Sequence, residues 1–373
     1  MTTPRIDVWP PLPFGTYARR PSKRLPFPLE DPRCRLFSLA RHALFAGVES
    51  LGLRPGDEVL VPAYHHGSEV EALIRAGIVC RFYDVGQHLE PDAKDLEALL
   101  GSRVRALYII HYLGFSQDSA RWRAWCDEHE LLLIEDAAQA WLGSRDGKPT
   151  GSHGDLSIFC LYKTFGLPDG AAIVSSSPPR QPRSEREAKI SRIVRLHGLY
   201  AAQRWKGAAQ LWRWLAQYRR RPGRPGRTGE HNPDRDFALG DPGRAPHVMT
   251  GFLLPRLARP EAQAVRAANY AFLLERLGRF VPEHFTTLPQ GSSPFAFPIW
   301  CERKEDLLQW LDQHGIVAEN FWAAPHPHLH VADFPRSAAL KKSVIALPVH
   351  QELSVRELER VADVVLDGLG PAR

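Results

Sequence analysis

An apolar strand that ends in two carboxylates is the first feature of the sequence that could do chemistry. The residues Ile134–Ala140 read IEDAAQA, and the apolar run 131–134 directly precedes Glu135 and Asp136. A carboxylate that loses its water at a strand end is costly in free energy unless a cation pairs with it. A protonated pyridine nitrogen is one such cation. A helix N-cap or a buried salt bridge would account for the motif as well.

A lysine, Lys163, lies 27 positions beyond Asp136, in the segment DLSIFCLYKTFGLPDGAAIV. It follows a second apolar strand, where burial would lower the pKa of the amine and allow it to form a Schiff base. A solvated surface charge is the plain alternative for a lone lysine. An acid and a lysine at two strand ends of one sheet are the pair that a pyridoxal phosphate enzyme needs, because the lysine binds the aldehyde and the acid pairs with the ring nitrogen.

The elements that must position these two residues alternate between strand and helix from Leu36 to about Val174. Short apolar strands are predicted at 57–64, 79–85, 105–113, 131–137, 155–161 and 170–175, and most of the intervals between them carry helical patterns. This pattern is typical of βαβ units and predicts an α/β fold with a mostly parallel sheet covered on both faces. Ligands bind such sheets at the carboxyl ends of the strands, where Asp136 and Lys163 are expected.

The rest of the sequence predicts an N-terminal arm before the large domain and a smaller domain after it. Residues 1–35 are rich in proline and read as an extended arm that packs on its own domain or reaches a partner subunit. Residues 36–250 form the large domain, with an irregular stretch after 175. Residues 251–373 combine a long linking helix with strands and helices, which predicts a smaller α+β C-terminal domain.

Composition excludes several classes of protein. Of the 373 residues, 44% are hydrophobic and 24% charged, which is typical of a soluble globular protein and excludes disordered and fibrous classes. There is no apolar run long enough for a transmembrane helix, and the start lacks the apolar segment of a secretory signal. The five scattered cysteines argue against a metal site or disulfides, so we expect a cytoplasmic protein.

Several motifs in the same order resemble the DegT/DnrJ/EryC1/StrS family of pyridoxal-phosphate-dependent sugar aminotransferases. They are GLRPGDEVLVPAY, AGIVCRFYDV, IIHYLG, IEDAAQA, KTFGLPDGAAIV and IALPVHQELS, and the resemblance extends from about Leu36 to Val365. It implies a fold type I, aspartate aminotransferase-like enzyme with pyridoxal 5'-phosphate as cofactor. It also implies transfer of an amino group, from glutamate, to a nucleotide-linked keto-sugar by a homodimer with shared active sites.

The resemblance assigns roles to single residues. Lys163 corresponds to the Schiff-base lysine, which also moves a proton during the reaction, and Asp136 to the acid that pairs with the pyridine nitrogen. Gln139 would contact the ring near its 3-oxygen. His66 stands where the family stacks an aromatic residue on the ring, although a plain loop histidine is equally expected there.

The phosphate site follows the resemblance less closely. Ala40, Arg41 and His42 stand where the family presents backbone N–H groups to the phosphate at a helix N-terminus, and Arg41 adds a positive charge. The family's phosphate-binding serine corresponds to Ile158, so the neighbouring Ser157 is predicted to replace it.

Other departures concern the substrate. The family's paired glycines appear here as Gly170 and Ala171, and its G-x-N-Y-R-M stretch is not recognisable. Two alternatives therefore stay open: a pyridoxal phosphate enzyme that acts on a non-sugar carbonyl compound or an amino acid, and a non-catalytic relative that binds the cofactor or a sugar. The intact Asp136, Gln139 and Lys163 weigh against the second alternative.

A basic, tryptophan-rich insertion spans about residues 200–230. Within it, 204–227 contains eight Lys or Arg and no acid, whereas the whole chain has a net charge of only +6. Three interpretations compete: a solvated insertion whose tryptophans pack on the protein body, a lid or partner-subunit element that meets an anionic substrate, and a contact with a membrane surface. No motif for nucleic-acid binding occurs, so we expect no nucleic-acid partner.

Overall fold

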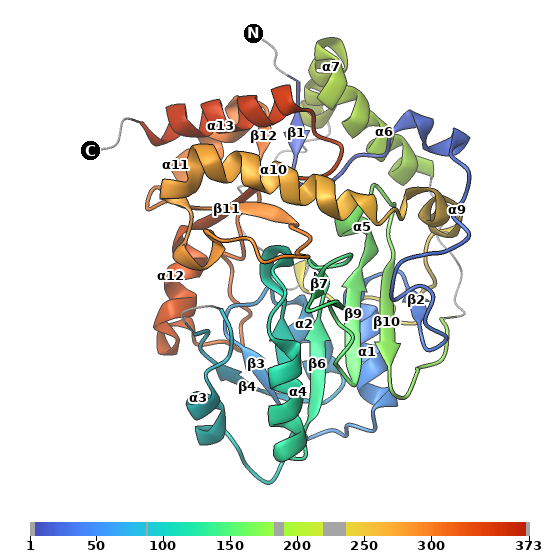
Figure 1. The fold of residues 1–373 in the computed structure, drawn as a ribbon, viewed down its shortest axis with the longest axis vertical. Helices are drawn as coiled ribbons and strands as arrows, with labels where there is room; N and C mark the ends of the chain where they lie inside the picture. Colours follow the sequence, from blue (N-terminus) through green and yellow to red (C-terminus); the bar gives the residue numbers. More distant parts are fainter. Residues whose placement is uncertain (1–3, 87–88, 183–189, 219–235, 371–373) are drawn as a thin grey trace.

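The computed structural model describes residues 4–86, 89–182, 190–218 and 236–370. A seven-stranded sheet forms its centre, in the order β2-β10-β9-β6-β5-β3-β4 (Figure 1). Neighbouring strands are parallel from β9 to β4, and β10 is antiparallel to both of its neighbours. The predicted α/β fold with a mostly parallel sheet is confirmed. The strands are β2 Arg35–Phe37, β3 Glu58–Pro62, β4 Val79–Tyr83, β5 Val104–Ile110, β6 Leu132–Asp136, β9 Leu156–Cys160 and β10 Ala171–Ser175.

Both faces of this sheet are covered by helices, because successive strand residues point to opposite faces. On β6, Ile134 joins the core beneath α1, whereas Leu133 packs with Trp122 and Trp125 of α4. Figure 1 shows α4 in front of the sheet and α1 behind it. The helices that connect the parallel strands are α1 Ala40–Ser50, α2 Ser68–Arg75, α3 Ala93–Ala98 and α4 Ser119–Glu128.

The C-terminal part is a smaller unit of strands and helices, as the sequence predicts. Its strands β11 Ala296–Trp300 and β13 Val344–Pro348 pair antiparallel, and the linking helix is α10 Glu261–Leu277. In Figure 1, α10 crosses above the central sheet, with α11 and α13 beyond it. The sequence predicts a loop where α12 forms, a helix that begins with proline, which is well tolerated there. The remaining helices are α11 Lys304–Gln313, α12 Pro335–Ser343 and α13 Val355–Leu369.

The N-terminal arm packs on its own chain. Its strand β1 (Ile6–Asp7) pairs parallel with β12 (Ile316–Val317) of the C-terminal part, and Ile6 is fully buried. A 3-10 turn, Phe14–Ala18, contacts α9 (Val248–Leu257) further along. The sequence leaves open whether the arm packs on its own chain or reaches a partner subunit, and the described part packs on its own chain.

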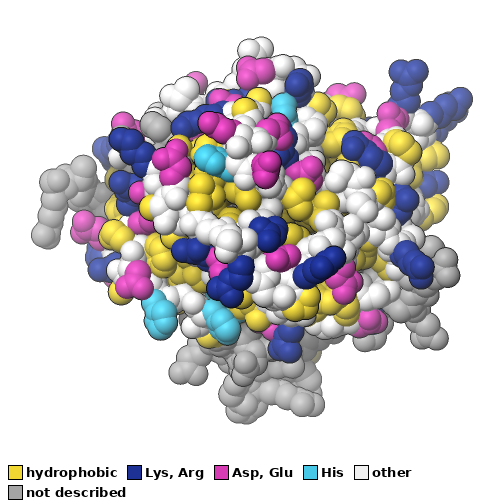
Figure 2. All heavy atoms as spheres, turned by 90° about the horizontal axis from the view of Figure 1, so that it is seen from below, with side chains coloured by type: hydrophobic (Ala, Val, Ile, Leu, Met, Phe, Trp, Pro, Cys, Tyr) yellow, Lys and Arg dark blue, Asp and Glu magenta, His cyan; other side chains and the backbone are white. Residues whose placement is uncertain are grey.

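The basic insertion begins as two helices, α6 (Ile190–Arg204) and α7 (Lys206–Tyr218), and residues 219–227 of the basic segment lie outside the described residues. Trp205 and Trp214 are 54% and 58% exposed, and the Trp205 ring stacks on Phe14 of the N-terminal arm, with ring centres 6.2 Å apart. The three interpretations of this segment stay open. Elsewhere the charges are mixed: Figure 2 shows acidic and basic side chains interspersed over one face. No helix in the described ranges is both long and apolar enough to cross a membrane.

Candidate active site

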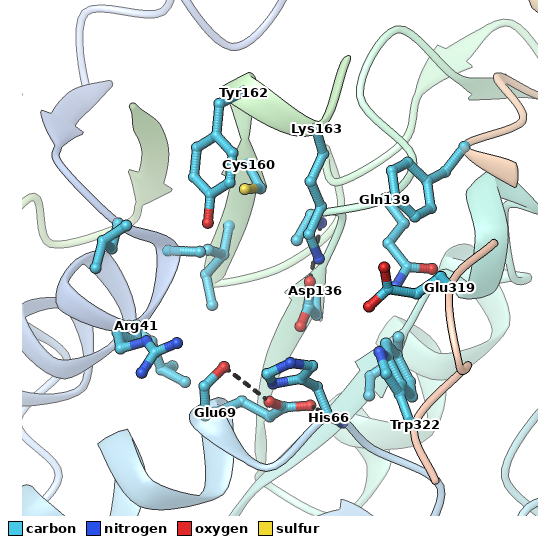
Figure 3. Close-up of a pocket in the computed structure, with 18 of the residues that line it drawn as sticks. Arg41, His66, Glu69, Asp136, Gln139, Cys160, Tyr162, Lys163, Glu319 and Trp322 are labelled. Carbon is cyan, nitrogen blue, oxygen red and sulfur yellow. Dashed lines mark hydrogen bonds between the residues drawn. The ribbon is translucent and has the colours of Figure 1, made fainter. Parts of the chain in front are cut away.

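The carboxyl ends of the central strands enclose a cavity of about 250 Å³ (Figure 3). Six of the residues that the sequence predicts for a site line it, namely Ala40, Arg41, His66, Asp136, Gln139 and Lys163. The structure therefore brings together residues from α1, the loop after β3, the end of β6 and the turn after β9. Other parts of the chain complete the wall with Trp9, Glu69, Tyr108, Cys160, Tyr162, Phe295, Glu319 and Trp322.

Asp136 is the last residue of β6, and two donors hold its carboxylate. The Tyr108 hydroxyl donates to Oδ2 at 2.7 Å and the Ala138 N–H donates to Oδ1 at 2.9 Å. Burial raises the pKa of Asp136, and the nearby carboxylate of Glu69 raises it further. The charged form therefore needs a cationic partner, and a protonated pyridine nitrogen is of the required kind.

Lys163 reaches the same cavity from the next strand. β9 pairs in parallel with β6, with Ile158 beside Asp136, and ends at Cys160. The single turn α5 (Leu161–Thr164) follows, and Figure 3 shows the Lys163 side chain extending from it toward Asp136. The amine lies 5.8 Å from the centre of the Phe295 ring, which also lines the cavity.

The turn that carries Lys163 is anchored from the linking helix. The carbonyl of Thr164 accepts hydrogen bonds from Arg266 at 2.8 Å and from the Gln351 amide at 3.0 Å. Arg266 is buried and also donates to the carbonyl of Pro294 and to the Gln351 side chain. These bonds tie α5 to the C-terminal part, so the position of the lysine depends on both parts of the fold.

Gln139 lies in the turn after β6 with its amide fixed. Its Oε1 accepts the backbone N–H of Leu113 at 2.7 Å, and its side chain is buried. Leu113 has a φ of +54°, a left-handed conformation that is uncommon for leucine. The turn between β5 and α4 is thereby joined to the IEDAAQA turn at the edge of the cavity.

His66 and Glu69 form the wall opposite Lys163. Glu69 accepts the backbone N–H groups of His66 at 2.9 Å and Gly67 at 3.1 Å, and it is only 7% exposed. Burial by itself raises the pKa of Glu69, but His66 and the backbone donors outweigh it and leave the pKa below its usual value. Glu69 therefore adds a negative charge to the cavity. The sequence motifs do not single out this residue.

The N-terminus of α1 also opens on the cavity, through Ala40 and Arg41. The residue before the helix, Leu39, offers no side-chain cap, so the first N–H groups of the helix are available to an anion. The Arg41 guanidinium donates to the carbonyls of Ala238 at 2.7 Å and Asp236 at 3.2 Å, which holds it at the wall. This end of the cavity suits a phosphate group.

The His42 side chain points away from the cavity, unlike that of Arg41. Its Nε2 lies 2.6 Å from the carbonyl of Leu239, to which it donates, and its Nδ1 accepts from the Ser38 hydroxyl at 2.9 Å. The ring is buried and does not line the cavity. A rotation of about 100° per residue along the helix turns it away from the direction of Arg41. The prediction for His42 concerns its backbone N–H group and not this side chain, so it stays a prediction.

The structure corrects the prediction for Ser157. Its side chain is fully buried but does not line the cavity, whereas Ile158 and Cys160 of the same strand do. The register pairs Ser157 with Glu135 and Ile158 with Asp136. Because adjacent strand residues point to opposite faces, a hydroxyl at position 157 cannot replace one at 158.

Glu135 supports the carboxyl end of β6 from the opposite face. Its carboxylate is fully buried and accepts from His111 at 3.0 Å, Ser119 at 2.5 Å, and the N–H groups of His153 at 2.8 Å and Gly154 at 2.5 Å. Burial alone would raise the pKa of Glu135, but these donors outweigh it and lower the pKa. The network fixes the strand residue directly before Asp136.

We expect Glu135→Gln to lower stability at neutral pH by about 1–3 kcal/mol, because one or more buried donors lose their acceptor. The pKa of Glu135 is lower in the folded than in the unfolded state. Its contribution is therefore fully present above the unfolded value, about 4.3, and is lost as the pH falls through the folded value. Urea unfolding between pH 7 and pH 3 should show a weaker loss of stability for Glu135→Gln than for the wild type.

The exposed Glu128 provides the matched control, since Glu128→Gln should change neither the stability nor its pH dependence. A Glu135→Gln protein whose stability falls with acid as steeply as the wild type would contradict the role assigned to this network.

Comparison with known proteins agrees with this geometry. Residues 34–366 match the DegT/DnrJ/EryC1/StrS aminotransferase family. GDP-perosamine synthase from Vibrio cholerae is 33% identical over 36% of this chain and 38% of that protein. UDP-N-acetyl-3-dehydro-alpha-D-glucosamine 3-aminotransferase from Acidithiobacillus ferrooxidans is 25% identical over 87% of this chain and 80% of that protein. Both are named as enzymes of amino-sugar synthesis.

Solved structures of aminotransferases have a similar fold. PseC from Helicobacter pylori, an aminotransferase involved in the biosynthesis of pseudoaminic acid, superposes with a TM-score of 0.70 at 16% identity, over 98% of this chain and 99% of that chain. Other structures of this fold have been solved in pyridoxal phosphate and pyridoxamine phosphate forms. The chain belongs to the DegT/DnrJ/EryC1/StrS family and is an aminotransferase of fold type I with pyridoxal phosphate as its cofactor.

Proposed function

We propose that this aminotransferase moves an amino group from glutamate to a keto-sugar linked to a nucleotide, through a Schiff base on Lys163. The observation that carries the proposal is the placement of Lys163 and Asp136, which adjacent parallel strands direct into one cavity. Relatives named for GDP-, UDP- and dTDP-linked sugars support the class of acceptor.

The proposed roles follow from the position of each side chain. When pyridoxal phosphate is bound, the Lys163 amine would hold its aldehyde carbon and would carry the proton that moves during the transfer. Asp136 keeps the pyridine nitrogen protonated, and Gln139 contacts the ring near its 3-oxygen. His66 would contact the ring face, and the N-terminus of α1 with Arg41 would hold the phosphate. Bound pyridoxal phosphate supplies the electron-withdrawing ring.

The charges of the cavity favour a hydroxylated acceptor. In addition to Asp136, the carboxylates of Glu69 and Glu319 line the wall and can accept hydrogen bonds from sugar hydroxyls.

We also propose that the enzyme is a homodimer in the cytoplasm. Apolar side chains lie half-exposed beside one another on the 3-10 turn and α9: Phe14, Tyr17, Val248 and Phe252 are 40–48% exposed. Such a patch is suited to a second subunit, and light scattering after size exclusion tests it. All five cysteines are unpaired, which suits a reducing compartment.

A half-reaction experiment tests the two substrates separately. The purified protein, loaded with pyridoxal phosphate, should show the visible band of the bound cofactor and lose it when glutamate is added, with release of one equivalent of 2-oxoglutarate. A panel of UDP-, GDP- and dTDP-linked keto-sugars should then include one that restores the band. A band that glutamate does not bleach would contradict the donor. Recovery with non-sugar carbonyl compounds alone would contradict the acceptor.

A further inference from the structure

Tyr162 places a hydroxyl in the cavity that no role described above uses. It directly precedes Lys163, and the short turn α5 directs both side chains into the cavity. Figure 3 shows the Tyr162 hydroxyl pointing into the cavity on the same side as Arg41, whereas Lys163 extends toward Asp136. The two neighbouring residues therefore serve opposite ends of one site.

The Tyr162 ring is held firmly in this direction. It stacks on Trp9 of the N-terminal arm, with ring centres 5.8 Å apart and planes inclined by 21°. Trp9 in turn packs edge-on against Phe295, 5.6 Å away. Burial raises the pKa of Tyr162 well above its usual value, and the neighbouring Cys160 side chain, with which the hydroxyl interacts, raises it further. The hydroxyl therefore keeps its proton and can donate a hydrogen bond.

Arg41 and the start of α1 are positive or are donors at this end of the cavity, and Figure 3 shows the Glu69 carboxylate beside Arg41. Arg41 carries a fixed positive charge, and the first turn of the 11-residue helix α1 has no side-chain cap. The cavity-facing residues of β9 offer no hydroxyl, because Ile158 is apolar and Ser157 points to the opposite face. Cys160 also faces the cavity, but a thiol is a weak donor.

We propose that the Tyr162 hydroxyl joins Arg41 and the N-terminus of α1 in binding the phosphate of the cofactor, in place of a serine from β9. The proposal rests on the proposed use of this cavity for pyridoxal phosphate. The turn α5 would then have two functions, because it carries both the phosphate-binding Tyr162 and the lysine. A phosphate bound by Tyr162 would also hold α5, and with it the backbone of Lys163, in place. Trp9 connects the arm to the same contact.

A comparison of two ligands tests this assignment without using turnover. Apoprotein is titrated with pyridoxal phosphate and, separately, with pyridoxal, which has the same aldehyde and ring but no phosphate. Tyr162→Phe should weaken pyridoxal phosphate about tenfold, as expected for a hydrogen bond to a charged group, and leave the affinity for pyridoxal unchanged. Inorganic phosphate should protect the wild-type apoprotein against heat more than it protects Tyr162→Phe. Tyr200→Phe on α6, outside the cavity, is the matched control.

Two results would overturn the proposal. One is an unchanged affinity of Tyr162→Phe for pyridoxal phosphate, and the other is an equal loss for both ligands, which would assign Tyr162 to the ring or to the fold. Neither result touches the proposed function, which is tested separately by the uptake of pyridoxal phosphate by the wild-type apoprotein and by the half-reactions described above.

Discussion

Lys163→Ala is expected to remove the visible band of the bound cofactor and to lower kcat by about 10⁴-fold. The variant loses the amine that binds the aldehyde and the group that moves the proton, and proton transfer by a positioned side chain contributes about 10²–10⁴-fold by itself. Absorbance spectra of the reconstituted protein and single-turnover rates with glutamate measure the two effects.

The exposed Lys148 on β8 (Lys148–Pro149) provides the control, because Lys148→Ala leaves the cavity unchanged. A Lys163→Ala protein that kept the visible band, with a rate close to the wild type, would show that another amine binds the cofactor.

Asp136→Asn is expected to lower kcat by about 10²–10³-fold, the size of effect seen when one preorganised electrostatic partner is removed. Asparagine has nearly the same shape: its oxygen can still accept from the Ala138 N–H, and its amide N–H can donate to the Tyr108 hydroxyl oxygen. It carries no charge, however, to keep the pyridine nitrogen protonated. Steady-state rates and cofactor affinity should both be measured, since the variant should still bind pyridoxal phosphate, though more weakly.

Asp146→Asn is the matched control, because the Asp146 side chain is 94% exposed in a turn outside the cavity. Wild-type kcat in Asp136→Asn would mean that Asp136 only holds its turn, which is the salt-bridge or cap interpretation of the IEDAAQA motif.

Asp136, Gln139 and Lys163 could be placed from the sequence because their positions depend on one simple rule. Each follows an apolar strand, and the carboxyl ends of parallel strands meet at one edge of a sheet. The strand pattern was sufficient to predict that edge, and the structure brings all three residues to one cavity there. In this part of the chain, the strand pattern in the sequence is enough to indicate where the site lies.

The phosphate end could not be placed in the same way, because there the outcome depends on which way single side chains point. Ser157 and Ile158 differ by one position and lie on opposite faces of β9. His42 differs from Arg41 by one helical position and points to the carbonyl of Leu239 instead of the cavity. A resemblance aligns positions, but it does not preserve a side-chain direction when the residue types have changed.

Other residues of the wall come from segments that only the tertiary fold brings near the sheet. Trp9 reaches the cavity because β1 pairs with β12, more than 300 positions away in the sequence. Trp322 and Glu319 follow β12 and lie outside the described helices and strands. Glu69 sits in the first turn of α2, where an acidic residue ordinarily signals helix capping. No local pattern distinguishes these residues from ordinary packing or capping residues.

The most direct test of the account is to identify the lysine that binds the cofactor. Protein loaded with pyridoxal phosphate is reduced with borohydride, which makes the link between cofactor and lysine permanent, and is then digested and mapped by mass spectrometry. The account predicts one modified peptide, with the pyridoxyl group on Lys163, and none in Lys163→Ala. Modification of a different lysine, or no modification in a protein that has taken up the cofactor, would contradict it.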